Sequence, residues 1–246
     1  MKQQTVMIIA HRGASALASH ENTLEAFQIA IDLKVDMAEL DVRRTKDEML
    51  IVFHDACIQG REISSLTYKE INEIAQKENY RVPMFSEVLA LCKGKIGLDI
   101  ELKERGFERE VVDMVRKRFG YDYGQFSIKS FLDEVSLTVK TLDSRITTGL
   151  LVGRTKADVK VRFSEYFPER RLRACRADFI SPYFQFVTKD FVHRMKRKGY
   201  PIYVWTVNDE NMMIKYGKRG VQGIITDYPN VGLQVREQYL KDDIKG

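Results

Sequence analysis

The sequence is poor in cysteine, with only Cys57, Cys92 and Cys175 among its 246 residues. An odd, sparse set without a C-x-x-C pair argues against a disulfide framework and suits a reducing compartment. We therefore predict that all three cysteines are packing residues and that none is a metal ligand or a nucleophile.

Long apolar runs are also missing, and none approaches the ~18 residues that a membrane helix needs. The apolar run near the N-terminus, Val6 to Ala10, is too short for the core of a signal peptide and stops at His11-Arg12. We therefore expect a cytoplasmic protein without a transmembrane segment.

A strong excess of one charge is absent too, since 40 Lys and Arg residues oppose 35 Asp and Glu residues and leave a net charge of +5. This balance allows an anionic partner without requiring nucleic acid, which we do not expect to bind. The basic residues are densest between Arg154 and Arg176. That stretch is either a solvated helix face or a peripheral contact with anionic lipid. The oligomeric state stays unknown at this level.

No low-complexity segment, short repeat or Pro/Gly/Ser-rich linker divides the chain, and the 44% hydrophobic content is typical of globular proteins. We therefore expect one domain over residues 1–246, close to the ~250 residues of one (β/α)8 barrel. Short apolar runs with β-branched residues alternate with helical patterns. The nine runs predicted as strands are Val6–Ala10, Met37–Val42, Met49–Phe53, Ile96–Ile100, Gln125–Ile128, Thr147–Val152, Asp178–Ser181, Ile202–Trp205 and Gly223–Thr226.

Two of these runs stand too close together for a parallel crossover. Only six residues separate Met37–Val42 from Met49–Phe53, whereas parallel neighbours need roughly a dozen or more. We therefore predict a hairpin with its turn about Lys46-Asp47. Eight parallel strands remain, and eight strands alternating with helices predict an α/β fold of the (β/α)8 TIM-barrel type.

The helical patterns between the strands have identifiable starts and faces. Asn22-Thr23 can cap a helix that has Glu25 in its third position and carries Phe27 and Ala30 on one side. A second apolar stripe runs from Phe107 to Phe119, and Asp209 can begin a third helix. In a barrel of this kind the active site lies at the C-terminal ends of the strands, so polar residues there become candidates for function.

Three carboxylates form the first such group. Glu39 and Asp41 share a strand face, ~6.6 Å apart along the strand, and Glu101 ends another predicted strand. Acids that point into a barrel repel one another unless a positive charge lies between them. A hard divalent cation such as Mg²⁺ or Ca²⁺ meets that need. Pairing with Arg12, Arg43 or Lys103 without any metal is the open alternative.

Two histidines, His11 and His54, also fall at strand ends, and the hairpin places His54 roughly opposite Glu39. Imidazole titrates near neutral pH, so two of them can act as a general acid and a general base. A structural role is the alternative for either one. For His20 and His193 a structural role is the prediction.

Cations and aromatic residues complete the candidate site. Arg12 follows His11, and Lys103 lies two residues beyond Glu101, so both could bind a phosphate group. Trp205, the only tryptophan, ends a strand and is either barrel core or an apolar wall for the substrate, with Phe131 as a second wall.

At this point the motifs resemble those of the glycerophosphodiester phosphodiesterase family. The matching stretches keep the family's order and span residues 11 to 229: His11-Arg12-Gly13, Glu21-Asn22-Thr23, Glu39-Leu40-Asp41-Val42, His54-Asp55, Asp99-Ile100-Glu101-Leu102-Lys103, Ser130-Phe131, Trp205-Thr206-Val207-Asn208 and Gly223-Ile224-Ile225-Thr226-Asp227-Tyr228-Pro229. Each stretch alone is weakly specific, but eight in order are strongly specific.

The resemblance implies a barrel of the phospholipase-C-like phosphodiesterase type that releases glycerol 3-phosphate and an alcohol from a small phosphodiester, as part of glycerol and lipid metabolism. It also implies a role for each residue of the site. These roles are His11 and His54 as the acid–base pair, Glu39, Asp41 and Glu101 as ligands of Mg²⁺ or Ca²⁺, and Arg12, Lys103, Glu21 and Trp205 around the substrate.

The sequence departs from the family pattern in loops near the predicted mouth of the barrel. His20 replaces the usual Pro, Glu48 replaces a turn Gly, and the run from Ala56 to Glu62 differs from the family's. These changes leave the chemical residues intact and put the identity of the substrate in doubt.

Two alternatives therefore stay open. A lysophospholipase D-type enzyme would need an apolar mouth, for which Tyr183, Phe184 and Phe186 are candidates. A non-catalytic barrel that binds phospholipids or metabolites would use the basic stretch but would not need two histidines.

Overall fold

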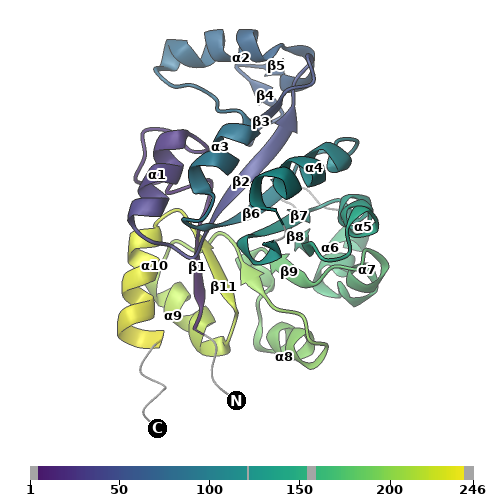
Figure 1. The fold of residues 1–246 in the computed structure, drawn as a ribbon. Helices are drawn as coiled ribbons and strands as arrows, with labels where there is room; N and C mark the ends of the chain where they lie inside the picture. The colour runs from purple at the N-terminus through teal and green to yellow at the C-terminus, as the bar shows by residue number, and fades with distance from the viewer. Residues whose placement is uncertain (1–4, 121, 154–158, 241–246) are drawn as a thin grey trace.

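The computed structural model describes residues 5–120, 122–153 and 159–240, and at its centre lies a curled sheet of parallel strands (Figure 1). The strands of the described residues, inside and outside this sheet, are β1 (Met7–Ala10), β2 (Met37–Arg44), β3 (Leu50–Val52), β4 (Cys57–Ile58), β5 (Arg61–Glu62), β6 (Gly97–Leu102), β7 (Phe126–Ser130), β8 (Thr147–Val152), β9 (Phe179–Pro182), β10 (Tyr203–Val204) and β11 (Gly223–Thr226).

Eight of these strands succeed one another around the barrel in the order β10-β11-β1-β2-β6-β7-β8-β9, and each hydrogen-bonded pair is parallel. Parallel bridges between Ile180 and Ile202 and between Tyr183 and Trp205 bring β9 back to β10. The prediction of a (β/α)8 barrel is confirmed. Because Ile202 and Trp205 make only isolated bridges, β10 is shorter than the predicted strand.

Apart from α2, the helices follow the barrel strands in the chain and cover the outside of the barrel (Figure 1). The helices are α1 (Leu24–Asp32), α2 (Tyr68–Ala75), α3 (Phe85–Cys92), α4 (Glu108–Phe119), α5 (Asp133–Leu142), α6 (Val159–Tyr166), α7 (Glu169–Ala174), α8 (Lys189–Arg197), α9 (Glu210–Arg219) and α10 (Pro229–Val235). As predicted, Thr23 caps α1 by accepting a hydrogen bond from the backbone N–H of Ala26, and Asp209 caps α9. None of the helices in the described ranges is long and apolar enough to span a bilayer.

The hairpin predicted after the second strand is present. Strand β3 pairs antiparallel with β2, with Val42 opposite Val52 and Arg44 opposite Leu50. The segment after β3 was not predicted from the sequence. In this segment β4, β5 and α2 form a small layer above the barrel in Figure 1. Its own core contains Ile58, Ile63, Leu66 and Ile71, among others.

The cysteine prediction is partly wrong. Cys92 and Cys175 are buried, and burial raises the pKa of these thiols to about 12 and about 11 respectively. Cys57 is exposed, because it lies on the two-residue strand β4, whose buried member is Ile58. The expectation of one domain over residues 1–246 stays a prediction.

Alternation along β2 orients the residues that matter for function. Ala38, Leu40 and Val42 belong to the main hydrophobic core under the helices. The intervening Glu39 and Asp41 therefore face the barrel interior, since successive strand residues point to opposite sides. The fold thus imposes burial on two acidic side chains.

Candidate functional site

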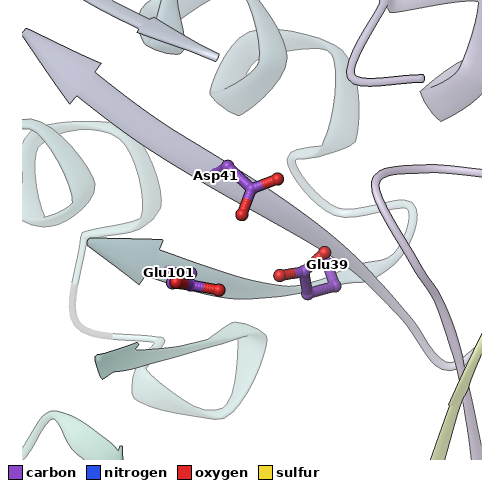
Figure 2. A group of neighbouring side chains, drawn as sticks. All are labelled: Glu39, Asp41 and Glu101. Carbon is purple, nitrogen blue, oxygen red and sulfur yellow. The ribbon is translucent and has the colours of Figure 1, made fainter. Parts of the chain in front are cut away.

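Three buried carboxylates meet inside the barrel. One oxygen each from Glu39, Asp41 and Glu101 lies within 4.8 Å of the other two, and in Figure 2 the carboxylates of Glu39 and Glu101 point toward one another. Strand register produces this arrangement, because Asp41 on β2 stands beside Glu101 on β6. The predicted convergence of three acids is therefore observed.

Lysine and arginine side chains contact the same carboxylates. Lys103 Nζ lies 2.9 Å from Asp41 Oδ1 and 2.8 Å from Glu101 Oε1, and Arg12 Nε lies 3.5 Å from Asp41 Oδ2. Arg43, the third cation considered from the sequence, binds Glu104 instead. Despite Lys103, burial together with repulsion from Asp41 and Glu39 raises the pKa of Glu101. More positive charge beside Glu101 would therefore stabilise its ionised form.

The donor set suits a hard divalent cation. Two opposite oxygen ligands of Ca²⁺ stand about 5 Å apart, at 2.3–2.6 Å from the ion, and the three carboxylate oxygens lie within 4.8 Å of one another. All three residues are at most 5% exposed, so bulk water does little to compensate their charges. The side chains present therefore fit a bound metal ion.

A second buried cation was not predicted from the sequence. Lys129 on β7 is 2% exposed, and its Nζ lies 2.6 Å from Asp99 Oδ2 and 3.6 Å from Glu39 Oε1. Ser127 donates a 2.7 Å hydrogen bond to the other oxygen of Asp99. The position of this lysine inside an apolar strand could have indicated a buried ion pair, because a buried ammonium requires acidic partners.

Replacing Lys129 by Met is expected to lower the free energy of unfolding by about 3 kcal/mol or more, because it leaves Asp99 charged and buried. The double variant K129M/D99N should recover part of that loss. As a matched control, Lys140→Met should cost about 1 kcal/mol or less, since its partner Asp178 is 44% exposed. Urea denaturation measures the free energy of unfolding of all three variants. If Lys129→Met lost no more of it than Lys140→Met, the buried ion pair between Lys129 and Asp99 would not contribute as proposed.

His11 is held by an acid from the opposite end of the chain. Its Nδ1 lies 2.6 Å from Asp227 Oδ1, and its Nε2 lies 4.0 Å from Glu39 Oε2. Burial opposes the ionisation of Asp227, but hydrogen bonds from His11, Asn208 and Ser15 outweigh it and lower the pKa of Asp227 to about 2. Asp227 therefore stays ionised and holds the Nδ1 side of the imidazole, so Nε2 is the nitrogen turned to the pocket.

His54 has a comparable arrangement on the hairpin side of the mouth. Its Nδ1 lies 2.7 Å from Asp55 Oδ1. The side chain of Arg43 donates a 2.9 Å hydrogen bond to the His54 carbonyl oxygen, which holds the backbone at this residue. Burial and the positive charge of Lys103 lower the pKa of His54. Both effects favour the neutral imidazole.

The other two histidines lie outside this group. His20 stacks on Tyr80 with ring centroids 4.3 Å apart, and its Nε2 lies 3.1 Å from the carbonyl oxygen of Glu78. The helix α8 carries His193 on its exposed side. Neither residue lines the pocket that contains His11 and His54.

A cavity of about 340 Å³ joins the charged residues to an apolar wall. Its lining residues are His11, Arg12, Glu39, His54, Glu101, Lys103, Lys129, Phe131, Leu151, Trp205 and Ile225. Trp205 packs edge-on against Phe131, with centroids 5.7 Å apart, and donates a 2.8 Å hydrogen bond to the Ser181 carbonyl. Trp205 and Phe131, the two aromatic residues considered from the sequence as substrate walls, therefore form one apolar wall of this cavity.

The loop after β1 shapes the charged side of this cavity. Arg12 and Asn22 have positive φ angles of 54° and 56°. The Arg12 backbone N–H donates to Glu39 Oε2 at 3.0 Å, and its side chain donates to Glu21 Oε1 at 2.7 Å. Gly13 is required beside them, because a Cβ there would come within 2.7 Å of Ala26. Glu21 is thus positioned to orient Arg12.

Residues 11–231 match the sequence model of the Glycerophosphoryl diester phosphodiesterase family. The chain belongs to this family. Similar proteins include Bacillus subtilis YhdW, which is 30% identical over 91% of this chain and 95% of its own length. A glycerophosphodiester phosphodiesterase of Caldanaerobacter subterraneus subsp. tengcongensis is 28% identical over 91% of this chain and 94% of its own.

A solved structure adds evidence on the fold. A phosphodiesterase from Oleispira antarctica, determined with the product sn-glycerol-3-phosphate, superposes with a TM-score of 0.78 at 22% identity and covers 94% of this chain and 97% of its own. The predictions of the family, of an enzyme of the glycerophosphodiester phosphodiesterase type and of its barrel fold are confirmed. The residue roles stay predictions.

Proposed function

We propose that this protein hydrolyses glycerophosphodiesters to glycerol 3-phosphate and an alcohol, using His11 and His54 as the acid–base pair. One observation carries the proposal: both imidazoles line the cavity that Glu39 and Glu101 of the carboxylate cluster also line, and each has Nδ1 on a carboxylate. Binding alone requires no such pair of oriented imidazoles.

Glu39, Asp41 and Glu101 would hold a divalent cation, Mg²⁺ or Ca²⁺. When bound, such an ion supplies Lewis-acid charge that neutralises phosphate oxygens as negative charge develops. Arg12 and Lys103, which also line the cavity, would bind the remaining phosphate oxygens through charge-assisted hydrogen bonds. Trp205 would pack against the apolar part of the substrate.

The environments of the two histidines support different roles. His54, whose lowered pKa favours the neutral imidazole, suits the base that removes a proton from the nucleophile, which is either the adjacent glycerol hydroxyl or water. His11 suits the acid, because Asp227 holds its Nδ1 and leaves Nε2 to give a proton to the departing alkoxide. A cyclic phosphate product would identify the hydroxyl as the nucleophile.

The pH dependence of kcat/KM should reflect His54. Burial lowers its pKa below the ordinary 6.5, so protonation of the base, and with it the loss of activity, should occur at lower pH than for an ordinary imidazole. A bound cation near the imidazole would lower the pKa of His54 further, so the direction of the shift would stay the same. Initial rates measured from pH 4.5 to 9 should show kcat/KM falling to half its maximum below pH 6.5. A half-maximum above pH 6.5 on the acid side would count against His54 as the base.

Incubation of the purified protein with glycerophosphocholine and Mg²⁺ or Ca²⁺ tests the activity itself. We expect glycerol 3-phosphate and choline to be released in equal amounts. A panel with ethanolamine, serine, inositol and glycerol head groups would then define the preferred alcohol. Saturable binding without products across this panel would favour the non-catalytic binding barrel instead.

A lysophospholipid is the second candidate substrate, because a further cavity of about 610 Å³ borders Trp205. Tyr183 and Phe186 line it, whereas Phe184 packs against the second hydrophobic core. If the acyl chain lies there, lysophosphatidylcholine should have a KM below that of glycerophosphocholine, and Trp205→Ala should remove this difference. Equal KM values would restrict the function to glycerophosphodiesters.

Location and domain organisation belong to the same proposal. The sparse cysteines support a cytoplasmic location, which fractionation of cells that express the protein would test. Limited proteolysis tests the single domain, since one domain should resist cleavage between its folded elements.

A further inference from the structure

Helix α6 and the residue just beyond it expose apolar side chains that the described residues of the chain cover only in part. Val159 is 86% exposed, Phe163 is 65% exposed and Phe167, just beyond the helix, is 42% exposed. The spacing of four residues places them along one helix face. The rings of Phe163 and Phe167 lie 4.8 Å apart, so the aromatic rings form one patch, which we call the α6 patch.

Packing does not explain this composition. Glu165 is the only buried residue of α6, whereas helices of this size normally bury an apolar stripe. Contiguous apolar surface on a protein usually marks an interaction site. The α6 patch is therefore a candidate interaction surface.

The patch lies close to the mouth of the barrel. Helix α6 comes after β8 in the chain, and its Tyr166 contacts Phe186 and Thr188, which follow β9. From α6, Arg162 and Tyr166 line the cavity that borders Trp205, and Trp205 also lines the cavity with the two histidines. A surface that covers the α6 patch would therefore lie beside the entrance to the candidate active site.

The surrounding charge identifies the kind of partner. Segment 159–176 contains six basic and two acidic residues, a net +4, compared with +5 for the whole chain. Lys160, Arg170 and Arg173 are exposed, whereas the acidic Glu165 is 1% exposed and Glu169 lies 3.5 Å from Arg194. Arg154, the other end of the basic stretch noted in the sequence, lies outside the described residues.

We propose that the α6 patch docks on an anionic lipid surface. Phe163 and its apolar neighbours enter the boundary between headgroups and acyl chains, while Lys160, Arg170 and Arg173 attract anionic headgroups. This combination of exposed aromatic residues and basic charge is the composition of interfacial helices. Docking would hold the barrel mouth at the lipid surface, and it does not require the proposed catalytic mechanism.

Sedimentation with sucrose-loaded vesicles of phosphatidylcholine, alone or with 30% phosphatidylglycerol as the probe, tests this proposal. We expect binding to the mixed vesicles, weaker binding to pure phosphatidylcholine, and a loss of binding as NaCl rises from 0.05 to 0.5 M. Phe163→Ser should reduce the partition coefficient about tenfold or more. The double charge reversal R170E/R173E should reduce it more than tenfold, since each removed basic charge is worth about fivefold.

Tyr239→Ser is the matched control, because Tyr239 is also an exposed aromatic residue, at 43% exposure. It belongs to the segment that directly continues α10, and α10 lies on the opposite side of the barrel from α6 in Figure 1. It should bind vesicles as the unchanged protein does. Phe163→Ser should turn over soluble glycerophosphocholine at the unchanged rate, which separates docking from catalysis. Absent vesicle binding, or equal binding by Phe163→Ser, would overturn the proposal. Self-association that Phe163→Ser abolishes, without vesicle binding, would instead assign the patch to a second copy.

Discussion

Replacing His11 or His54 by Ala is expected to reduce turnover of glycerophosphocholine about 10²–10⁴-fold, the usual contribution of a positioned acid or base. Each variant removes an imidazole that lines the charged cavity. The loss should appear in kcat, because neither residue supplies the main charge for phosphate binding. Initial rates of glycerol 3-phosphate release at saturating substrate measure the effect.

The controls separate chemistry from folding. His193→Ala, on the exposed face of α8, should retain full activity. Both active-site variants should keep the circular dichroism spectrum and unfold cooperatively, because His11 and His54 lie at the cavity and outside the hydrophobic clusters. Near-normal turnover in either one would remove that histidine from the mechanism.

Glu101→Gln is expected to weaken binding of Mg²⁺ or Ca²⁺ at least about 100-fold and to remove most activity, because a neutral amide replaces one of three carboxylate ligands. Stability without metal should respond in the opposite direction. Burial raises the pKa of Glu101, so its ionised form destabilises the folded protein increasingly as pH rises above the unfolded-state value. The variant lacks this penalty and should be at least as stable as the unchanged protein at pH 7.

Two measurements distinguish these effects. Isothermal titration gives the metal affinity, and thermal unfolding with and without Ca²⁺ gives the stabilisation that a ligand of the folded state must produce. Glu104→Gln is the matched control, since Glu104 pairs with Arg43 outside the cavity. An unchanged metal affinity in Glu101→Gln would show that the cation is held elsewhere.

Local sequence patterns predicted the barrel and the position of its charged residues. Alternation in Glu39-Leu40-Asp41 requires both acids to share a face, and the short connection after β2 permits only an antiparallel return. These are constraints within one or two neighbouring strands, which a sequence displays directly. They were enough to place the three carboxylates and both histidines near one another.

The features that the sequence did not reveal depend on contacts between distant strands. The pairing of His11 with Asp227 joins residues 216 positions apart, and nothing local to either residue indicates it. Lys129 reaches Asp99 across the β6–β7 register, so its role appears only once strand neighbours are known.

The layer formed by β4, β5 and α2 escaped prediction for another reason. Its strands have two residues each, and both residues of β5 are exposed, so neither shows a periodic apolar pattern. The same weak pattern explains the wrong expectation for Cys57. Departures from the family sequence concentrate in and beside this layer, where His20 contacts Tyr80.

Phosphorus NMR of one glycerophosphocholine sample, monitored through removal and return of the metal, tests the central claim most directly. We predict conversion to glycerol 3-phosphate with Mg²⁺ or Ca²⁺, arrest on addition of excess chelator, and resumption when the cation is restored. Conversion that continues unchanged in chelator, or no conversion with either cation, would contradict a metal-assisted pair of histidines in this barrel.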